Sequence, residues 1–290
     1  MAGKLVMSLK KRLPVKLLQR LRKLYNFFLK KFNLLISKEE FRLLLTNKLG
    51  VKKGSVVFIH SSVDKMFLGF SYLDILPMLR EIVGSEGTLI FPCSHIKIRA
   101  EEYLENPEAV FDVKHSVTVR GILPEIARQE DDAFRSLHPT NSVVAIGKLA
   151  RELTIHHHET IYPCGEKSPF FEITRYNGLI LGLGISVDRL SFVHSVEDVM
   201  KEEFPVRTRL DKKYECKVID NDNNRLTVLT LAASREIGHR NVKKFIRKYI
   251  TEDVCRLFRY KGVPFFSADS KKLFDIMASL AREGKTIYSV

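Results

Sequence analysis

The chain has 290 residues and a mass of 33.4 kDa, enough to bury a substantial core without disulfides or metal ions. Hydrophobic residues make up 45% of it and charged residues 28%, which excludes disordered, collagen-like and low-complexity proteins. No apolar run approaches the roughly 20 uncharged residues of a membrane-spanning helix. The four cysteines lie far apart without paired spacing. We therefore expect a globular protein of the reducing cytoplasm, with no metal site.

The positive charge is concentrated at the N-terminus. Residues 1–38 hold eleven Lys or Arg and no Asp or Glu, which leaves +3 of the net charge of +14 on the rest. Apolar residues recur here at three- and four-residue steps: Leu17, Leu21, Leu24, Phe28, Phe32 and Leu35. We expect residues 1–36 to form a basic amphipathic helical extension. It packs on the domain or on a second subunit of a homo-oligomer, or it binds an anionic membrane surface; no nucleic-acid module is present.

Residues 37–290 alternate strand and helix patterns and predict one domain. Ser37 and Glu40 have capping-box spacing at the start of a helix that ends near Gly50. Apolar runs bounded by glycine or polar residues predict strands at 55–60, 87–92, 142–146 and 179–183, with a helix at 73–83 between the first two. The fold class is therefore α/β, a mixed central sheet flanked by helices.

The last ninety residues predict a hairpin followed by helices and a strand. Runs at 214–219 and 225–231 flank a polar cluster rich in Asn and Asp, which is typical of a turn. A basic helix is expected at 242–249 and a strand at 263–268. Asp269 is a suitable N-cap for the final helix.

Several short motifs then stand in a recognisable order. They are His60-Ser61-Ser62, Gly87-Thr88 with Pro92, Phe111-Asp112, Gly121 with Pro124-Glu125, Arg135-Ser136-Leu137-His138-Pro139-Thr140-Asn141-Ser142, Gly165 with Ser168-Pro169, Gly182-Leu183-Gly184 and His194-Ser195-Val196-Glu197. The set resembles the aminoglycoside 3-N-acetyltransferase family over residues 37–270. The most specific part is RSxHPTxS followed by HxxE. The resemblance implies the antibiotic N-acetyltransferase fold and an enzyme that transfers an acyl group, usually acetyl, from coenzyme A to an amine.

The HxxE motif suits this chemistry. An ammonium group must lose a proton before it attacks, and a histidine held by a carboxylate is a suitable base. His194 and Glu197 are three residues apart, so they are neighbours if the segment is helical. The resemblance implies that His194 is the general base and that Glu197 orients it or binds the acceptor. The alternative is a buried histidine beside a surface glutamate.

Two further motifs are assigned to the co-substrate, acetyl-CoA or another acyl-CoA. The resemblance implies that Ser61 and Ser62 hold the pantetheine and thioester, with backbone amides of their turn as oxyanion donors. It also implies that four residues of the RSxHPTxS motif contact coenzyme A and the active-site wall: Arg135, Ser136, His138 and Thr140. Each serine could instead form an ST-turn or a helix cap, and His138 could serve only as loop support.

Other conspicuous residues favour less specific interpretations. The run His156-His157-His158 is expected in a solvated loop, because consecutive side chains cannot converge on one metal ion. Cys93 and Cys164 lie beside family motifs, but nothing in the sequence lowers a thiol pKa, so direct transfer is expected instead of an acyl-cysteine. Asn141 departs from the family pattern, which puts acceptor geometry in doubt.

The charge of the chain bears on the acceptor. Aminoglycosides are polycations, whereas a basic protein with a pI near 9.6 favours anionic partners. We therefore expect a nucleotide- or lipid-linked amino sugar of bacterial surface polysaccharide biosynthesis as the small-molecule acceptor. Residues 1–36 would place the enzyme peripherally on the inner face of the membrane. The alternatives are an aminoglycoside 3-N-acetyltransferase that confers antibiotic resistance and a non-catalytic relative that binds a membrane or a partner.

Overall fold

The computed structural model describes residues 17, 35–234, 237 and 240–289. The predicted basic helix of residues 1–36 lies almost entirely outside the described residues, so it stays a prediction, as does its boundary with the domain. None of the described helices is both long and apolar enough to cross a bilayer.

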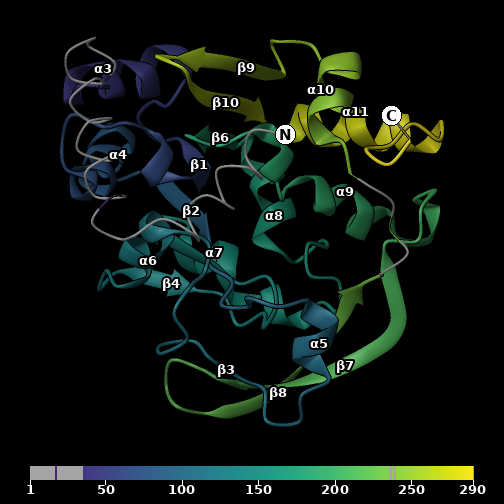
Figure 1. Cartoon of the computed structure of the whole chain (residues 1–290). Coiled ribbons are helices and arrows are strands. Elements are labelled where there is room, and N and C mark those ends of the chain that lie inside the picture. Colours follow the sequence, from purple (N-terminus) through teal and green to yellow (C-terminus); the bar gives the residue numbers. More distant parts are fainter. Residues whose placement is uncertain (1–16, 18–34, 235–236, 238–239, 290) are drawn as a thin grey trace.

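A mixed sheet forms the centre of the molecule (Figure 1). Within the described residues it has seven strands, in the order β4 (Ala133–Arg135), β5 (Val143–Gly147), β2 (Thr88–Pro92), β1 (Val56–Ser61), β6 (Leu179–Leu183), β10 (Val263–Asp269) and β9 (Cys255–Tyr260). β1 pairs in parallel with β2 and β6, and the other neighbours pair antiparallel. The expected mixed α/β fold class is confirmed.

Helices cover both faces of this sheet. Successive side chains of β1 point to opposite faces and so join two different cores. Val57 and Ile59 join the core under three helices, α3 (Lys38–Leu43), α4 (Ile75–Val83) and α6 (Ile122–Arg128). Phe58, between them, joins the core on the opposite face. Five helices cover that second face: α7 (Ala150–Ile155), α8 (Pro169–Glu172), α9 (Val193–Met200), α10 (Val242–Tyr249) and α11 (Ser270–Arg282).

The predicted signals at the helix ends are present. In the capping box of α3, the Glu40 amide donates to Ser37 Oγ at 3.1 Å and the Ser37 amide donates to Glu40 Oε2 at 2.8 Å. A π-helical turn, η1 (Leu44–Lys48), extends α3. The remaining helices are α5 (Ala100–Leu104), η2 (Val63–Lys65), η3 (Tyr72–Asp74), η4 (His157–Glu159), η5 (Ile173–Tyr176), η6 (Val187–Arg189) and η7 (Lys201–Glu203).

The predicted hairpin belongs to a second, three-stranded sheet. β7 (Arg209–Ile219) and β8 (Arg225–Ala233) pair antiparallel, and β3 (Val110–Asp112) adds to β7 in parallel. The sheet has small apolar clusters of its own, one of them around Phe111 and Val218. It lies apart from the central sheet, across the lower part of Figure 1. The start of β7 and the end of β8 reach back toward α9 and contribute to the site described below.

The parallel strands place functional residues at one edge of the central sheet. The C-terminal ends of β1, β2 and β6 meet there, the usual position for ligand sites in such sheets. Gly184 turns the chain just after β6 with φ +69°, and a Cβ at this position would lie 2.7 Å from the Ser62 carbonyl oxygen. Only glycine fits such a position without strain. The chain can therefore pass close to the end of β1 before it enters α9.

Candidate active site

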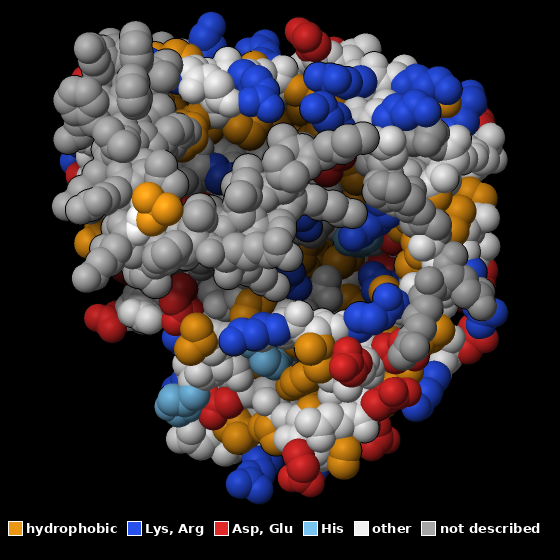
Figure 2. Space-filling model, in the orientation of Figure 1, with side chains coloured by type: hydrophobic (Ala, Val, Ile, Leu, Met, Phe, Trp, Pro, Cys, Tyr) orange, Lys and Arg blue, Asp and Glu red, His pale blue; other side chains and the backbone are white. Residues whose placement is uncertain are grey.

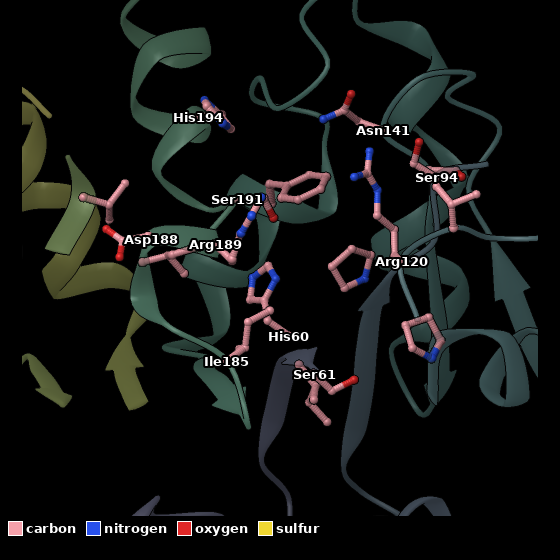
Figure 3. Close-up of a pocket in the computed structure, with 18 of the residues that line it drawn as sticks. His60, Ser61, Ser94, Arg120, Asn141, Ile185, Asp188, Arg189, Ser191 and His194 are labelled. Atoms are coloured by element: carbon pink, nitrogen blue, oxygen red, sulfur yellow. The ribbon is translucent and has the colours of Figure 1, made fainter. Parts of the chain in front are cut away.

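A cavity of about 420 Å³ opens at the carboxyl edge of the sheet (Figure 3). We call it the strand-edge pocket. Its lining comes from the ends of β1 and β2, from the segments after β2 and β6 and before β5, and from α8 and the starts of α6, α9 and α10 with the residues just before them. The lining residues are Ile59, His60, Ser61, Pro92, Ser94, Val119, Arg120, Pro124, Asn141, Ser142, Phe170, Ile185, Asp188, Arg189, Leu190, Ser191, His194, Arg240 and Val242. The strand end forms its floor, and Arg120 and Arg189 enter from opposite sides.

A second cavity of about 360 Å³ is lined by α9, by the start of β7 and by the end of β8. We call it the hairpin pocket. Its lining is Arg99, Ala100, Glu101, Thr140, Asn141, His194, Glu197, Thr208, Arg209, Leu231, Ala233, Ser234, Ile237, Arg240 and Tyr288. Asn141, His194 and Arg240 line both cavities. The histidine predicted from the HxxE motif therefore stands where two ligand-sized spaces meet.

His194 is held by a buried carboxylate on its own helix, as its spacing predicts. Its Nδ1 lies 2.9 Å from Glu197 Oε2, and the hydroxyl of Tyr288 donates to Glu197 Oε1 at 2.8 Å. Burial would raise the pKa of Glu197, but the charge of His194 and the hydrogen bonds from His194 and Tyr288 lower it below its ordinary value. Glu197 is thus an anion held against one nitrogen of the ring.

The other ring nitrogen faces Arg240. The guanidinium Nη1 lies 2.5 Å from His194 Nε2, and a guanidinium can only donate. Nε2 therefore accepts, and the proton of the neutral ring is on Nδ1, where it donates to Glu197. This tautomer is the one a general base needs, because its lone pair on Nε2 points away from the carboxylate.

A second buried ion pair supports the helix behind this histidine. Arg209 donates to both oxygens of Asp198, each at 2.6 Å, and the Cys164 amide donates to Asp198 Oδ2 at 2.7 Å. Asp198 is fully buried. Burial would lower the pKa of Arg209, but the Asp198 charge raises it, so the pair stays ionised. It joins α9 to β7 and so fixes His194 relative to the hairpin.

The two predicted serines have different positions. Ser61 lies on the floor of the strand-edge pocket, and its buried hydroxyl has no hydrogen-bond partner within the described residues. Ser62 does not line the pocket. Its hydroxyl donates to Asp64 Oδ1 at 2.8 Å and its amide donates to the Leu183 carbonyl at 2.9 Å. That amide is already engaged, so the geometry does not support its predicted use as an oxyanion donor.

The RSxHPTxS motif is divided. Thr140, Asn141 and Ser142 line the pockets, whereas Arg135, Ser136 and His138 line neither, which differs from their predicted contact with coenzyme A. Arg135 is buried and donates to the backbone carbonyls of Val113, Ser116 and Cys93, at 3.1, 2.5 and 2.6 Å. These bonds use the donors that a phosphate would need. They tie β4 to two loops, which is a structural role.

The other residues of this motif are buried as well. Ser136 Oγ accepts from the Val143 amide at 3.0 Å and lies 2.9 Å from His157 Nδ1. His138 has no exposed surface and stacks on His157, with ring centroids 4.6 Å apart. Of the four predicted contacts, Thr140 alone reaches a cavity, the hairpin pocket, within the part of the chain that the structure describes.

The prediction of a solvated histidine run was wrong for its middle residue. His157 has no exposed surface, and its Nε2 lies 2.9 Å from the Pro163 carbonyl oxygen. Burial lowers its pKa to about 4, so it is neutral near pH 7. Its ring packs against His138 in the interior, whereas the side chain of His156, one position earlier, is exposed.

Four residues that line the site were not singled out by sequence reasoning. His60 lies on the pocket floor; burial lowers its pKa to about 3, and its Nε2 has no partner within the described residues. Arg120, Arg189 and Arg240 are exposed at the pocket. Ion pairs between described residues include none of these three arginines. His60 belongs to the quoted motif His60-Ser61-Ser62 but was given no role, whereas the arginines had no motif to mark them.

The cysteines near the site do not suit covalent catalysis. Cys93 and Cys164 are fully buried. Burial raises the pKa of both thiols, and the nearby Asp198 charge raises that of Cys164 further. A thiol that stays protonated is a poor nucleophile. This supports the expected direct transfer.

Comparisons with known proteins agree with the motif order. The family model described as aminoglycoside 3-N-acetyltransferase matches residues 58–282. Aminoglycoside N(3)-acetyltransferase IX of Micromonospora chalcea is 28% identical over 172 residues, 54% of this chain and 61% of that protein. Aminoglycoside N(3)-acetyltransferase III of Serratia marcescens is 29% identical over 186 residues, 60% of this chain and 67% of that protein.

Solved structures share the fold. Aminoglycoside acetyltransferase AAC(3)-Xa superposes with a TM-score of 0.76 at 20% identity, over 91% of this chain and 99% of that one. AAC-IIIb, solved as a binary complex with CoASH, gives 0.72 at 21% identity, over 86% and 97%. The aligned part spans only about three fifths of the Micromonospora relative, so activity and substrates are treated below as proposals. The family match over most of the domain shows that the chain belongs to the aminoglycoside 3-N-acetyltransferase family.

Proposed function

We propose that this protein is an acetyl-CoA-dependent N-acetyltransferase that acts on an amine of an amino sugar. The observation that carries the proposal is His194, which lines two adjacent cavities and is held on Nδ1 by the buried Glu197. A bisubstrate transfer needs one base beside two binding spaces. The non-catalytic alternative gains no support, because a purely structural helix would not require a buried carboxylate that holds a histidine facing a cavity.

The strand-edge pocket fits acetyl-CoA. Its floor has two buried polar atoms without partners in the described chain, His60 Nε2 and Ser61 Oγ, and Arg120 and Arg189 offer cations for phosphates. When bound, acetyl-CoA would supply an activated acetyl group for attack by an amine. The hairpin pocket would then hold the acceptor, on the other side of His194.

In this arrangement, His194 Nε2 takes a proton from the acceptor ammonium and releases it to solvent, which leaves the nitrogen lone pair free to attack. Glu197 keeps the ring in the required tautomer and stabilises the imidazolium that forms. Tyr288 fixes the carboxylate through its hydroxyl. After the attack the nitrogen loses a second proton to His194, and the ring passes this proton to the leaving thiolate.

The names of the relatives make aminoglycosides the reference acceptors. They favour this alternative over the polysaccharide precursor expected from the overall charge. The specific observation that keeps an anionic amino sugar as a second candidate is the set of arginines around the pockets, described in the next subsection.

Thiol release from acetyl-CoA tests the reaction. We expect purified protein to release CoA thiol in the presence of an amino-sugar acceptor and to form an acetylated product, seen as an added acetyl group by mass spectrometry. The acceptor panel contains kanamycin, a neutral methyl glycoside of glucosamine and UDP-glucosamine. Thiol release without an acetylated acceptor indicates hydrolysis only. No release with any acceptor contradicts the proposal.

A further inference from the structure

Arg240 occupies an unusual position for an arginine beside a general base. Its side chain is exposed, lines both pockets and donates from Nη1 to His194 Nε2 at 2.5 Å. That nitrogen carries the lone pair which must accept the amine proton. In this structure the base is therefore covered by a guanidinium, and catalysis requires the guanidinium to bind elsewhere.

The charges of the hairpin pocket indicate what would draw it away. Its lining cations are Arg99, Arg209 and Arg240, and its lining carboxylates are Glu101 and Glu197. Arg209 is neutralised by Asp198, and Glu197 is committed to His194 and Tyr288. No ion pair between described residues includes Arg99 or Arg240. Among the described lining charges outside these pairs, two arginines stand against one carboxylate, Glu101, so the pocket favours an anion over a polycation.

The donor has other cations available. Arg120 and Arg189 line the strand-edge pocket and not the hairpin pocket, whereas Arg99 lines only the hairpin pocket. The phosphates of coenzyme A can therefore be matched without Arg99 and Arg240. Two guanidiniums on the acceptor side of the base suit a planar or tetrahedral anion that accepts two or more hydrogen bonds.

We infer that the acceptor is an amino sugar with an anionic group, a phosphate or a carboxylate, which Arg240 binds together with Arg99. This deepens the proposed function and rests on it. Arg240 is then the residue that selects the acceptor, and binding of the anion also exposes the base. A neutral or polycationic amino sugar leaves Arg240 on Nε2.

Proton and bond changes are balanced in this scheme. The anion of the acceptor takes the Arg240 N–H donors, and His194 Nε2 accepts a proton from the acceptor ammonium. The freed amine nitrogen forms a bond to the acetyl carbonyl carbon, and the bond from that carbon to the CoA sulfur breaks. The attacking nitrogen loses two protons in all. The first, taken from the ammonium by His194, is released to solvent; the second leaves the nitrogen as the amide forms, passes through His194 and protonates the thiolate, so no oxidant or further reactant is needed.

Kinetics of Arg240 variants test the inference. The acceptors are glucosamine 6-phosphate, 2-amino-2-deoxyglucuronate, methyl glucosaminide and kanamycin, each with acetyl-CoA. We expect wild-type kcat/KM to be highest on one of the two anionic acceptors. Which of the two is preferred tells whether the site binds a phosphate or a carboxylate. Arg240→Gln lowers that value by about 10- to 100-fold, the effect of losing a charged hydrogen bond, and leaves methyl glucosaminide at or above its wild-type value. Arg240→Lys retains part of the preference.

Controls distinguish a failure of the inference about Arg240 from a failure of the proposed function. Arg225→Gln removes an exposed arginine of β8 that lines neither pocket and should leave both acceptor classes unchanged. If Arg240→Gln lowers kcat/KM equally on anionic and neutral acceptors, or raises KM for acetyl-CoA instead, the inference is wrong although the proposed function stands. Wild-type preference for kanamycin would also overturn it. No thiol release with any acceptor contradicts the proposed function itself.

Discussion

The two motifs that carry the family resemblance have different tasks in the folded protein. The HxxE segment lies on α9 and presents His194 and Glu197 at the junction of two pockets. The RSxHPTxS segment is divided: Arg135 and Ser136 bond to neighbouring loops and strands, whereas Thr140, Asn141 and Ser142 line the pockets. Part of a conspicuous motif can therefore hold the frame of a site while another part lines it. Arginine and serine can do either, and the sequence gives the residue types but not their partners.

The largest effect expected for the framework motif is on stability. Arg135→Met leaves three carbonyl oxygens without their donor in the interior, and we expect the free energy of unfolding to fall by about 3 kcal/mol. Denaturant titration measures it, with Arg225→Met as an exposed control. The KM for acetyl-CoA should not change at a temperature where the variant is folded. A large rise in this KM with normal stability would make Arg135 a coenzyme ligand.

For the HxxE motif we expect the opposite pattern. Glu197→Gln keeps the size of the side chain but removes the charge that stabilises the imidazolium, so kcat should fall by about 10²-fold. The KM for each substrate should change little. Steady-state kinetics and a melting curve of the same sample separate the loss of catalysis from a loss of stability. If kcat falls only to the extent that the melting curve shows the variant to be unfolded, Glu197 is a packing residue and not part of the catalytic pair.

The start of the domain provides a smaller test, of whether Ile36 belongs to the folded domain or to the N-terminal extension. Ile36 is fully buried, its amide donates to the Phe67 carbonyl at 2.9 Å, and its carbonyl accepts from the Gly69 amide at 2.8 Å. Deleting residues 1–36 should therefore cost about 2 kcal/mol more than deleting residues 1–34, from lost burial. Thermal melts of the two truncations measure the difference. Equal stability would place the true boundary after Ile36, where the sequence placed it.

The smallest effect is expected for the pocket floor. Ser61→Ala removes a hydroxyl that faces the strand-edge pocket, and the KM for acetyl-CoA should rise about 3- to 10-fold, as for one lost hydrogen bond. Ser62→Ala, whose hydroxyl bonds to Asp64, should leave that KM unchanged. If Ser62→Ala raises the KM for acetyl-CoA and Ser61→Ala does not, acetyl-CoA binds on the Ser62 side of the turn.

Sequence reasoning was most reliable where one segment carried the whole signal. The helix at Val242–Tyr249, the hairpin and the four central strands follow from local periodicity, and the pairing of His194 with Glu197 follows from helical spacing. The edge strand β9 was missed because its exposed arginines, Arg256 and Arg259, stand three positions apart, which breaks the alternating pattern of a half-buried strand.

What the sequence did not predict depends on contacts between distant segments. Arg240 meets His194 across 46 positions, and Tyr288 meets Glu197 across 91. His157 was placed in solvent because its neighbours are polar, yet tertiary packing buries it against His138. The positive charge around the base likewise comes from arginines on four separate segments of the chain, Arg99, Arg120, Arg189 and Arg240. Net charge suggested an anionic partner, but only the fold shows which arginines lie beside the base.

The central claim is that one histidine serves both pockets as the base. The direct measurement is His194→Ala, with kcat from thiol release and dissociation constants for CoA and acceptor from calorimetry. The account predicts that kcat falls by about 10²- to 10⁴-fold while both ligands still bind with nearly unchanged affinity. An exposed histidine, His115→Ala, is the matched control. Turnover close to wild type in His194→Ala would contradict the claim.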